Sequence, residues 1–242
     1  MDIQDNSVKT PSASLKKALS KFCIAVVFSI ALGYFEAAVV VYLREIFYPN
    51  GFTFPLTIFS IEPLTKRIFL TEVGREAASI VLIFTGAWLF GANRWQRAAY
   101  FLIIFATWDI FYYVWLKVLL DWPSSIMDWD ILFLIPVTWA SPVLAPVICS
   151  LVMLLFAAVI LYRDCLGKSI YVTYLDWFVF SIASLIIIVS FCIPGPYTNQ
   201  AEYYTYFHWP LFGTGILLAV GTFIKCLFKT EQVLSEAVNN EL

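Results

Sequence analysis

The side chains of this protein that could do chemistry are a few ionisable residues set inside long apolar stretches. Glu36 and Asp109 are the clearest cases, because each lies within a run of hydrophobic residues. A charge at the centre of a bilayer costs about 2.5–3.5 kcal/mol on insertion scales, so such residues usually face a bundle interior or a wet cavity. Two carboxylates brought together in this way could hold a cation, or could act as a general acid and base.

A second group of ionisable residues follows the helical repeat. Glu72 and Glu76 are four residues apart and share one helix face, with Arg75 between them in the sequence. Glu36 or Glu76 could form an ion pair with Arg75 that fixes the register of two helices. Glu36 also lies one turn after Gly33, and a glycine at that point would let a neighbouring helix approach closely.

A third group begins at Asp109. Tyr113 and Lys117 follow it at intervals of four residues, so the three side chains line one stripe, and Asp109 and Lys117 could form a structural ion pair. Asp130 lies in the connection after this stretch, and His208, the one histidine, opens the last apolar run. The predicted ligand-binding residues are therefore Glu36, Arg75, Glu76, Asp109, Tyr113, Lys117, Asp130 and His208.

The elements that must position these residues are membrane-spanning segments. Of the 242 residues, 61% are hydrophobic and 13% are charged, whereas a soluble domain is usually about 45–50% apolar and about 25% charged. This composition excludes a single soluble domain, a disordered chain and a disulfide-rich secreted protein. Stretches that approach the roughly 20 apolar residues needed to cross a bilayer occur at 22–43, 75–90, 98–120, 142–161, 175–193 and 207–228.

The predicted fold class is all-α. We expect a polytopic membrane bundle of about six transmembrane helices, because continuous apolar runs favour helices over barrel strands. Interfacial or re-entrant segments are expected on the external side. Residues 15–229 are predicted to form one domain, between a disordered cytoplasmic tail at 1–14 and a polar cytoplasmic tail at 230–242.

The distribution of basic residues predicts the orientation. Most of the 15 Lys and Arg residues lie beside one set of span ends, and basic residues mark the cytoplasmic side. Both termini are therefore predicted to be cytoplasmic, in a multi-pass protein of the cell (inner) membrane. On this orientation nearly all ionisable residues near the span cores fall in the outer half, and the inner halves are almost purely apolar.

Two segments between the spans are interrupted by proline. Residues 52–70 are too apolar for a free loop and too broken for a span, so an interfacial or re-entrant segment is predicted there. Residues 131–136 are predicted to dip into the outer leaflet, with Ser141 and Pro142 capping the fourth span. Broken segments at membrane depth line cavities, and in transporters they often form the ligand site.

The side-chain inventory limits the cofactors. A single histidine excludes a bis-histidine haem and the histidine-rich zinc sites of membrane hydrolases, and the five cysteines form no C-x-x-C pair. No cofactor is evident, although the carboxylates would suit a hard divalent cation such as Ca²⁺ or Mg²⁺. A pI near 5.4 and the lack of a basic patch exclude nucleic acid as a partner.

Three hypotheses about function remain, all with the lipid bilayer as a partner. In the first, the first, second, third and sixth spans wall an acidic cavity, open to the external face, that binds a small cation or polar ligand and in one version transports it. In the second, the protein is a membrane-embedded enzyme acting on a lipid-like substrate at the outer leaflet, with Glu36 and Asp109 as acid and base. In the third, it is a structural or assembly subunit of a membrane complex, and the same charges join helices.

Overall fold

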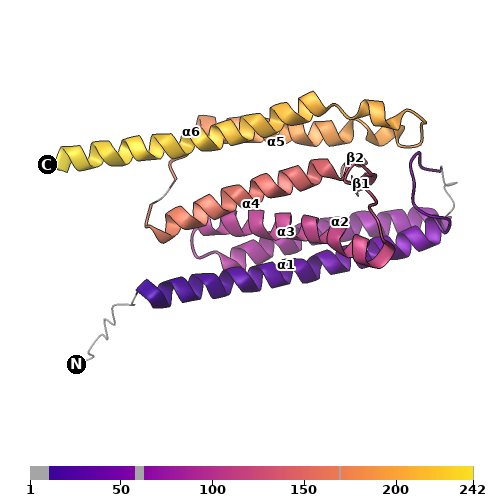
Figure 1. Ribbon diagram of the computed structural model, residues 1–242, viewed down its shortest axis with the longest axis horizontal. Helices are drawn as coiled ribbons and strands as arrows, with labels where there is room; N and C mark the ends of the chain where they lie inside the picture. Colours follow the sequence, from indigo (N-terminus) through magenta and orange to yellow (C-terminus); the bar gives the residue numbers. More distant parts are fainter. Residues whose placement is uncertain (1–10, 58–62, 169, 242) are drawn as a thin grey trace.

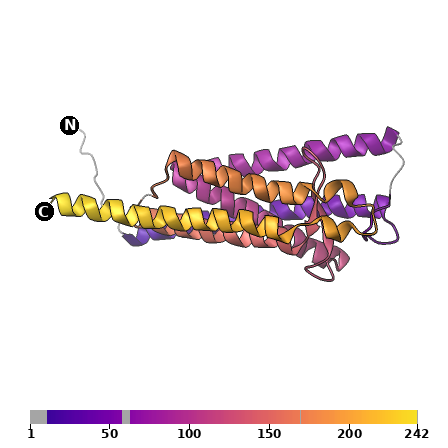
Figure 2. The ribbon, with the colours of Figure 1, turned by 90° about the horizontal axis from the view of Figure 1, so that it is seen from above.

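The computed structural model describes residues 11–57, 63–168 and 170–241. Its helices lie roughly parallel to one long axis, as both ribbon views show (Figures 1 and 2). Six of them are long and apolar enough to cross a membrane, which confirms the predicted class of multi-pass helical membrane protein. They are α1 (Pro11–Phe47), α2 (Pro63–Phe90), α3 (Arg94–Leu120), α4 (Leu144–Cys165), α5 (Tyr174–Cys192) and α6 (Trp209–Glu241).

The surface of the bundle is apolar, as a lipid-facing surface must be. Val27, Leu89 and Leu217 are all mostly exposed, and so are many other large hydrophobic side chains along the helices. The chain starts and ends its helical course at the same end of the bundle, where α1 begins and α6 ends (left in Figure 1). That placement agrees with an even number of spans.

Helix α3 is the centre of the bundle. Helices α1, α2 and α4 all pack against it, whereas α5 and α6 pack against each other and join the rest through α4 and a short strand. Helix α3 begins at an Asn93 cap, whose side chain accepts from the N–H of Gln96, and ends at Asp121 in the left-handed conformation. At the end of the bundle where α1 begins, the core is formed by aliphatic and aromatic side chains that include Ile83, Ile104 and Phe223.

The segment predicted to dip into the outer leaflet, residues 131–136, forms part of a β-hairpin. Strands β1 (Trp129–Phe133) and β2 (Trp139–Pro142) are antiparallel, with Asp130 opposite Ser141 and an irregularity between Ile131 and Phe133. Pairing the two strands satisfies backbone groups that lipid could not. Aromatic and β-branched residues such as Trp129, Ile131 and Phe133 favour strands.

The other boundary predictions need smaller corrections. Helix α2 starts at Pro63, well before the predicted 75, because proline is tolerated at the first helical position. The interfacial segment predicted at 52–70 is therefore helical from 63 onward; residues 58–62 lie outside the described part of the chain. Ser141 and Pro142 do not cap α4, since they belong to β2 and the Ser141 hydroxyl donates to the carbonyl of Pro142.

The first and last helices extend into the segments predicted to be tails. Residues 1–10 of the N-terminal tail lie outside the described residues, and α1 begins at Pro11. At the other end, α6 runs on to Glu241, so the backbone of the predicted polar tail is helical almost to its end.

Gly33 brings two helices together, as its position in the sequence predicted. A Cβ atom at Gly33 would lie 3.0 Å from the carbonyl oxygen of Trp108 and 3.3 Å from the Cβ of Phe111. Helix α3 therefore approaches the backbone of α1 one turn before Glu36. Gly74, by contrast, has nothing within 4 Å of such an atom.

We expect Gly33→Ala to lower the thermal stability of the purified protein. Forcing a methyl group against the α3 backbone costs about 1–3 kcal/mol by overpacking. Gly74→Ala is the matched control, and it should be neutral or slightly stabilising because alanine has the higher helix propensity. Equal effects of the two substitutions on the melting temperature would show that α1 and α3 do not meet at Gly33.

Orientation is open to a direct labelling experiment. With the five native cysteines replaced, Ala201→Cys should react with a membrane-impermeant maleimide added to intact cells. Ala92→Cys, at the opposite end of the bundle and equally exposed, should react only after permeabilisation. The reverse pattern would show that the basic ends of the spans do not face the cytoplasm.

Candidate functional site

A cavity of about 730 Å³ lies at the hairpin end of the bundle. Its wall comes from α1, α2, α3, α4 and the β-hairpin, with Phe191 of α5 and two loop segments completing it. Helix α6 contributes no lining residue among those described, so α4 and the hairpin take the place predicted for the sixth span. Most of the wall is aliphatic or aromatic, for example Val40, Phe105, Trp108, Phe133, Leu134, Trp139 and Met153.

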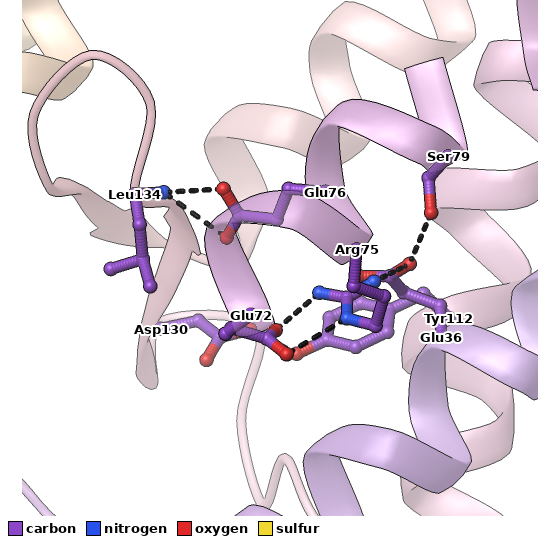
Figure 3. A network of polar contacts seen from close by, with 8 residues as sticks. All are labelled: Glu36, Glu72, Arg75, Glu76, Ser79, Tyr112, Asp130 and Leu134. Atoms are coloured by element: carbon purple, nitrogen blue, oxygen red, sulfur yellow. Dashed lines mark hydrogen bonds and ion pairs between the residues drawn. The ribbon is translucent and has the colours of Figure 1, made fainter. Parts of the chain in front are cut away.

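Arg75 joins two carboxylates at the α1–α2 side of the cavity. Its guanidinium forms ion pairs with Glu36 of α1 and with Glu72, one turn earlier on α2, and Nε lies 2.9 Å from Oε2 of Glu72. The hydroxyl of Ser79 donates to Glu36 at 3.2 Å. Figure 3 shows Arg75 held between these groups. The predicted pairing of Glu36 with Arg75 is thus present, and Glu72 shares it.

Glu76 connects α2 to the hairpin. Its two carboxylate oxygens lie 3.1 and 2.9 Å from the backbone nitrogen of Leu134, which donates to them. Figure 3 shows this carboxylate directed away from Arg75, toward the hairpin. The side chain is buried, yet within the described residues it has no ion-pair partner.

Asp109 occupies a deeper position on α3. The hydroxyl of Ser150 on α4 donates to its Oδ2 at 2.8 Å. The alternative pairing of Asp109 with Lys117 is wrong, because Lys117 is 51% exposed and pairs with Asp121 at 2.7 Å. In the part of the chain that the structure describes, Asp109 has no basic partner.

Asp130 is held by a buried ion pair with Arg44. Nη2 of Arg44 lies 3.0 Å from Oδ1, and the two side chains are 7% and 2% exposed. The hydroxyl of Tyr112 donates to Oδ2 at 3.1 Å. Burial raises the pKa of the Asp130 carboxyl above its usual range, and the charge of Arg44 opposes that rise.

Arg44 is a cavity residue that sequence reasoning missed. Its guanidinium lies over the rings of Phe52 and Trp122, 4.0 and 3.8 Å from their centroids. The arginine ends an apolar run, which is the ordinary place for a residue that reaches to water. The one sign of it in the sequence is that Arg44 is a basic residue at the predicted external end of the first span, whereas most Lys and Arg residues lie at the predicted cytoplasmic ends.

The structure brings together six of the eight predicted residues and separates two. Glu36, Arg75, Glu76, Asp109, Tyr113 and Asp130 all line the cavity. Lys117 and His208 do not, and both are exposed. His208 precedes α6, whose first turn lies outside the cavity wall.

Several lining side chains carry buried donors that have no hydrogen-bond partner among the residues that the structure describes. They are Nη1 of Arg44, Nε1 of Trp108, the hydroxyl of Tyr113 and Nε1 of Trp139. These atoms are shielded from solvent. The wall therefore offers unsatisfied donors in addition to carboxylate acceptors, and buried polar groups are normally satisfied.

The donor set does not gather into a metal centre. Across residues 11–57, 63–168 and 170–241, no three His, Cys, Asp or Glu side chains come close enough to hold a metal ion. The carboxylates are instead divided among Arg75, Arg44, Ser150 and the backbone of Leu134. The suggestion of a hard divalent cation stays a prediction from the sequence.

The fold and the cavity together define the class of the protein. It is a multi-pass helical membrane protein with a largely apolar cavity and buried carboxylates at one end of its bundle. Comparison with family models, with curated proteins and with solved structures finds no match to this chain.

The Arg44–Asp130 pair makes a testable contribution to stability. We expect Arg44→Met to destabilise the protein by about 3–5 kcal/mol, because it leaves a buried carboxylate without its partner. The double variant Arg44→Met, Asp130→Leu should recover much of that loss. Lys117→Ala breaks an exposed pair and should change stability by about 0–1 kcal/mol. A double variant no more stable than Arg44→Met would contradict the buried pair.

Proposed function

We propose that the cavity binds an amphipathic ligand that presents hydrogen-bond donors to Glu76 and Asp109. The observation that carries this proposal is the division of the cavity carboxylates into two kinds. Glu36, Glu72 and Asp130 are paired with arginine. Glu76 and Asp109 line the same cavity without a basic partner among the described residues.

The charge balance of the cavity supports a donor-bearing ligand. Five carboxylates and two arginines line it, and both arginines are already engaged in ion pairs. An anionic group would therefore find no lining arginine, among the described residues, that is not already in an ion pair. An ammonium or hydroxyl group, by contrast, would add a donor to carboxylates that accept only from the Leu134 N–H and the Ser150 hydroxyl among the described residues, and hydrogen bonds to charged groups contribute about 1.5–3 kcal/mol.

The rest of the wall suits the apolar part of such a ligand. Aromatic rings of Phe105, Trp108, Phe133 and Trp139 line the cavity, and Met153 lies at its side. A ligand pocket is usually a mainly apolar cavity of about 300–1,000 Å³ with a few placed polar groups. The volume of about 730 Å³ falls within this range.

The packing beyond the cavity supports binding more than passage through the bundle. Toward the opposite end, the buried cluster around Ile83, Ile104 and Phe223 is apolar. A carrier needs a polar route to both sides, and polar residues at membrane depth mark such routes. We therefore propose that the ligand enters and leaves at the hairpin half of the bundle.

An enzymatic role that uses Glu36 as a base has less support. Glu36 is occupied by Arg75 and by the hydroxyl of Ser79. These contacts occupy the carboxylate, so a substrate would have to displace one of them to reach it. If the site performs acid–base chemistry, Glu76 and Asp109 are the better candidates.

The proposal can be tested with single-chain probes that differ only in their polar group. For the protein in amphipol, native mass spectrometry should detect binding of dodecylamine or monododecanoylglycerol, but not of dodecanoate. Glu76→Gln and Asp109→Asn should each lower the affinity for the probe about tenfold to a hundredfold. This corresponds to the loss of one charge-assisted hydrogen bond. Preference for dodecylamine would indicate an ammonium ligand, and preference for the glyceride a hydroxyl-bearing one.

Two exposed carboxylates provide matched controls. Glu45→Gln and Asp121→Asn make the same chemical changes outside the cavity and should leave binding unchanged. Equal binding of all three probes, or equal effects of cavity and control variants, would overturn the proposal.

A further inference from the structure

A second hollow of about 540 Å³ lies between α1 and α2. The two helices both pack on α3 but contact each other little. Apolar side chains form most of its wall, and those of Phe35 and Leu82 are exposed on the surface of the bundle. On a membrane protein this surface faces lipid, so the hollow is a cleft open to the bilayer. Its lining is Phe28, Ala31, Leu32, Phe35, Glu36, Val39, Arg75, Ala78, Ser79 and Leu82.

The cleft and the cavity share two residues. Glu36 and Arg75 line both hollows, and their ion pair spans α1 and α2 at the point where the two hollows meet. Ser79, which donates to Glu36, lies on the cleft side. A polar pair thus lies between a lipid-facing apolar cleft and a cavity that holds two carboxylates without a basic partner among the described residues.

The cleft is about as long as half the thickness of the hydrocarbon core of a bilayer. From Phe28 to Val39 it extends about 16 Å along α1, at about 1.5 Å per residue. This is close to half of the roughly 30 Å hydrocarbon core of a bilayer. At the Phe28 end, the ring lies against Gly86, where a Cβ would be 3.3 Å from Phe28 Cε1. The cleft is therefore closed at that end and leads to the cavity at the other.

We propose that the α1–α2 cleft holds the hydrocarbon chain of the ligand, and that the ligand is a membrane lipid with a neutral or cationic, donor-bearing polar group. The chain lies along Phe28, Leu32 and Phe35, and the polar group passes the Glu36–Arg75 pair to reach Glu76. This inference rests on the proposed function of the cavity and adds the class of ligand and its lateral route of entry.

A lipid chain fits the cleft better than a protein helix does. The hollow adjoins, at Glu36 and Arg75, a cavity that contains carboxylates, and a lipid has two chemically different ends to fill the two spaces. An apolar helix packed on the cleft would leave Glu76 and Asp109 as they are. Binding of a second copy is therefore an alternative outcome of the test.

The test fills the cleft and compares a probe that has a chain with one that lacks it. Ala78 lines the cleft, and Ala77 is equally exposed beside it on α2 but does not. We expect Ala78→Trp to weaken binding of dodecylamine by about tenfold or more, since tenfold corresponds to losing the burial of only about two methylene groups. Ala77→Trp should not weaken it. Ethanolamine has the ammonium group without the chain, and it should bind the wild type and both variants equally.

Labelling gives a second measurement that needs no variant. Dodecylamine with a diazirine at the end of its chain should crosslink to the peptides that contain Phe28 or Leu82. Crosslinks confined to the cavity wall, or equal dodecylamine affinity in the Ala77 and Ala78 variants, would overturn the inference. So would a change of oligomeric state in Ala78→Trp with unchanged probe binding, which would assign the cleft to a second copy.

The outcomes for the cleft and the cavity are separable. If Glu76→Gln weakens dodecylamine binding while Ala78→Trp does not, the proposed function stands and the lateral chain site fails. If neither Glu76→Gln nor Asp109→Asn has an effect, the proposed function itself fails.

Discussion

The ion pair between Arg44 and Asp130 fixes the geometry on which the cavity depends. It joins the end of α1 to the first strand of the hairpin, and Tyr112 adds a hydrogen bond from α3. A buried charge without a partner is costly in a protein interior and more so within lipid. The hairpin is therefore joined to α1 and α3, two of the helices that form the cavity wall, and the rings of Phe52 and Trp122 lie against the arginine that joins it.

The other buried charged residues differ in how far they are paired with an opposite charge. Arg75 is shared by Glu36 and Glu72, so it joins α1 to α2 across a gap where these helices otherwise have little contact. Within the described part of the chain, Glu76 and Asp109 have only neutral donors, the N–H of Leu134 and the hydroxyl of Ser150. Because a membrane protein rarely keeps such groups for stability alone, these two carboxylates are where function is best sought.

The sequence was sufficient for features that depend on a short helical repeat. The six spans, the Glu36–Arg75 pair and the close approach at Gly33 all come from spacing within one or two helices. Features that depend on distant parts of the chain were not predictable in this way. The role of Arg44 needs a partner in a later hairpin, and that hairpin was hidden because a short apolar run has no clear period.

The prediction that Lys117 and His208 line the cavity was wrong for a related reason. Lys117 lies on the same helical stripe as Asp109, but it is two turns nearer the helix end, where Asp121 is available and water is close. His208 was placed by depth alone, and depth does not say which side of a helix faces a cavity. The wall of the cavity was assigned to the sixth span for the same reason, whereas α4 and the hairpin form it.

The most direct test of the central claim is a cryo-electron microscopy map of the protein in nanodiscs of its native membrane lipids. The account predicts non-protein density within hydrogen-bond distance of Glu76 or Asp109, continuing between α1 and α2 as a chain. A map in which the cavity holds only water, or in which both carboxylates are paired with basic side chains of the protein, would contradict it.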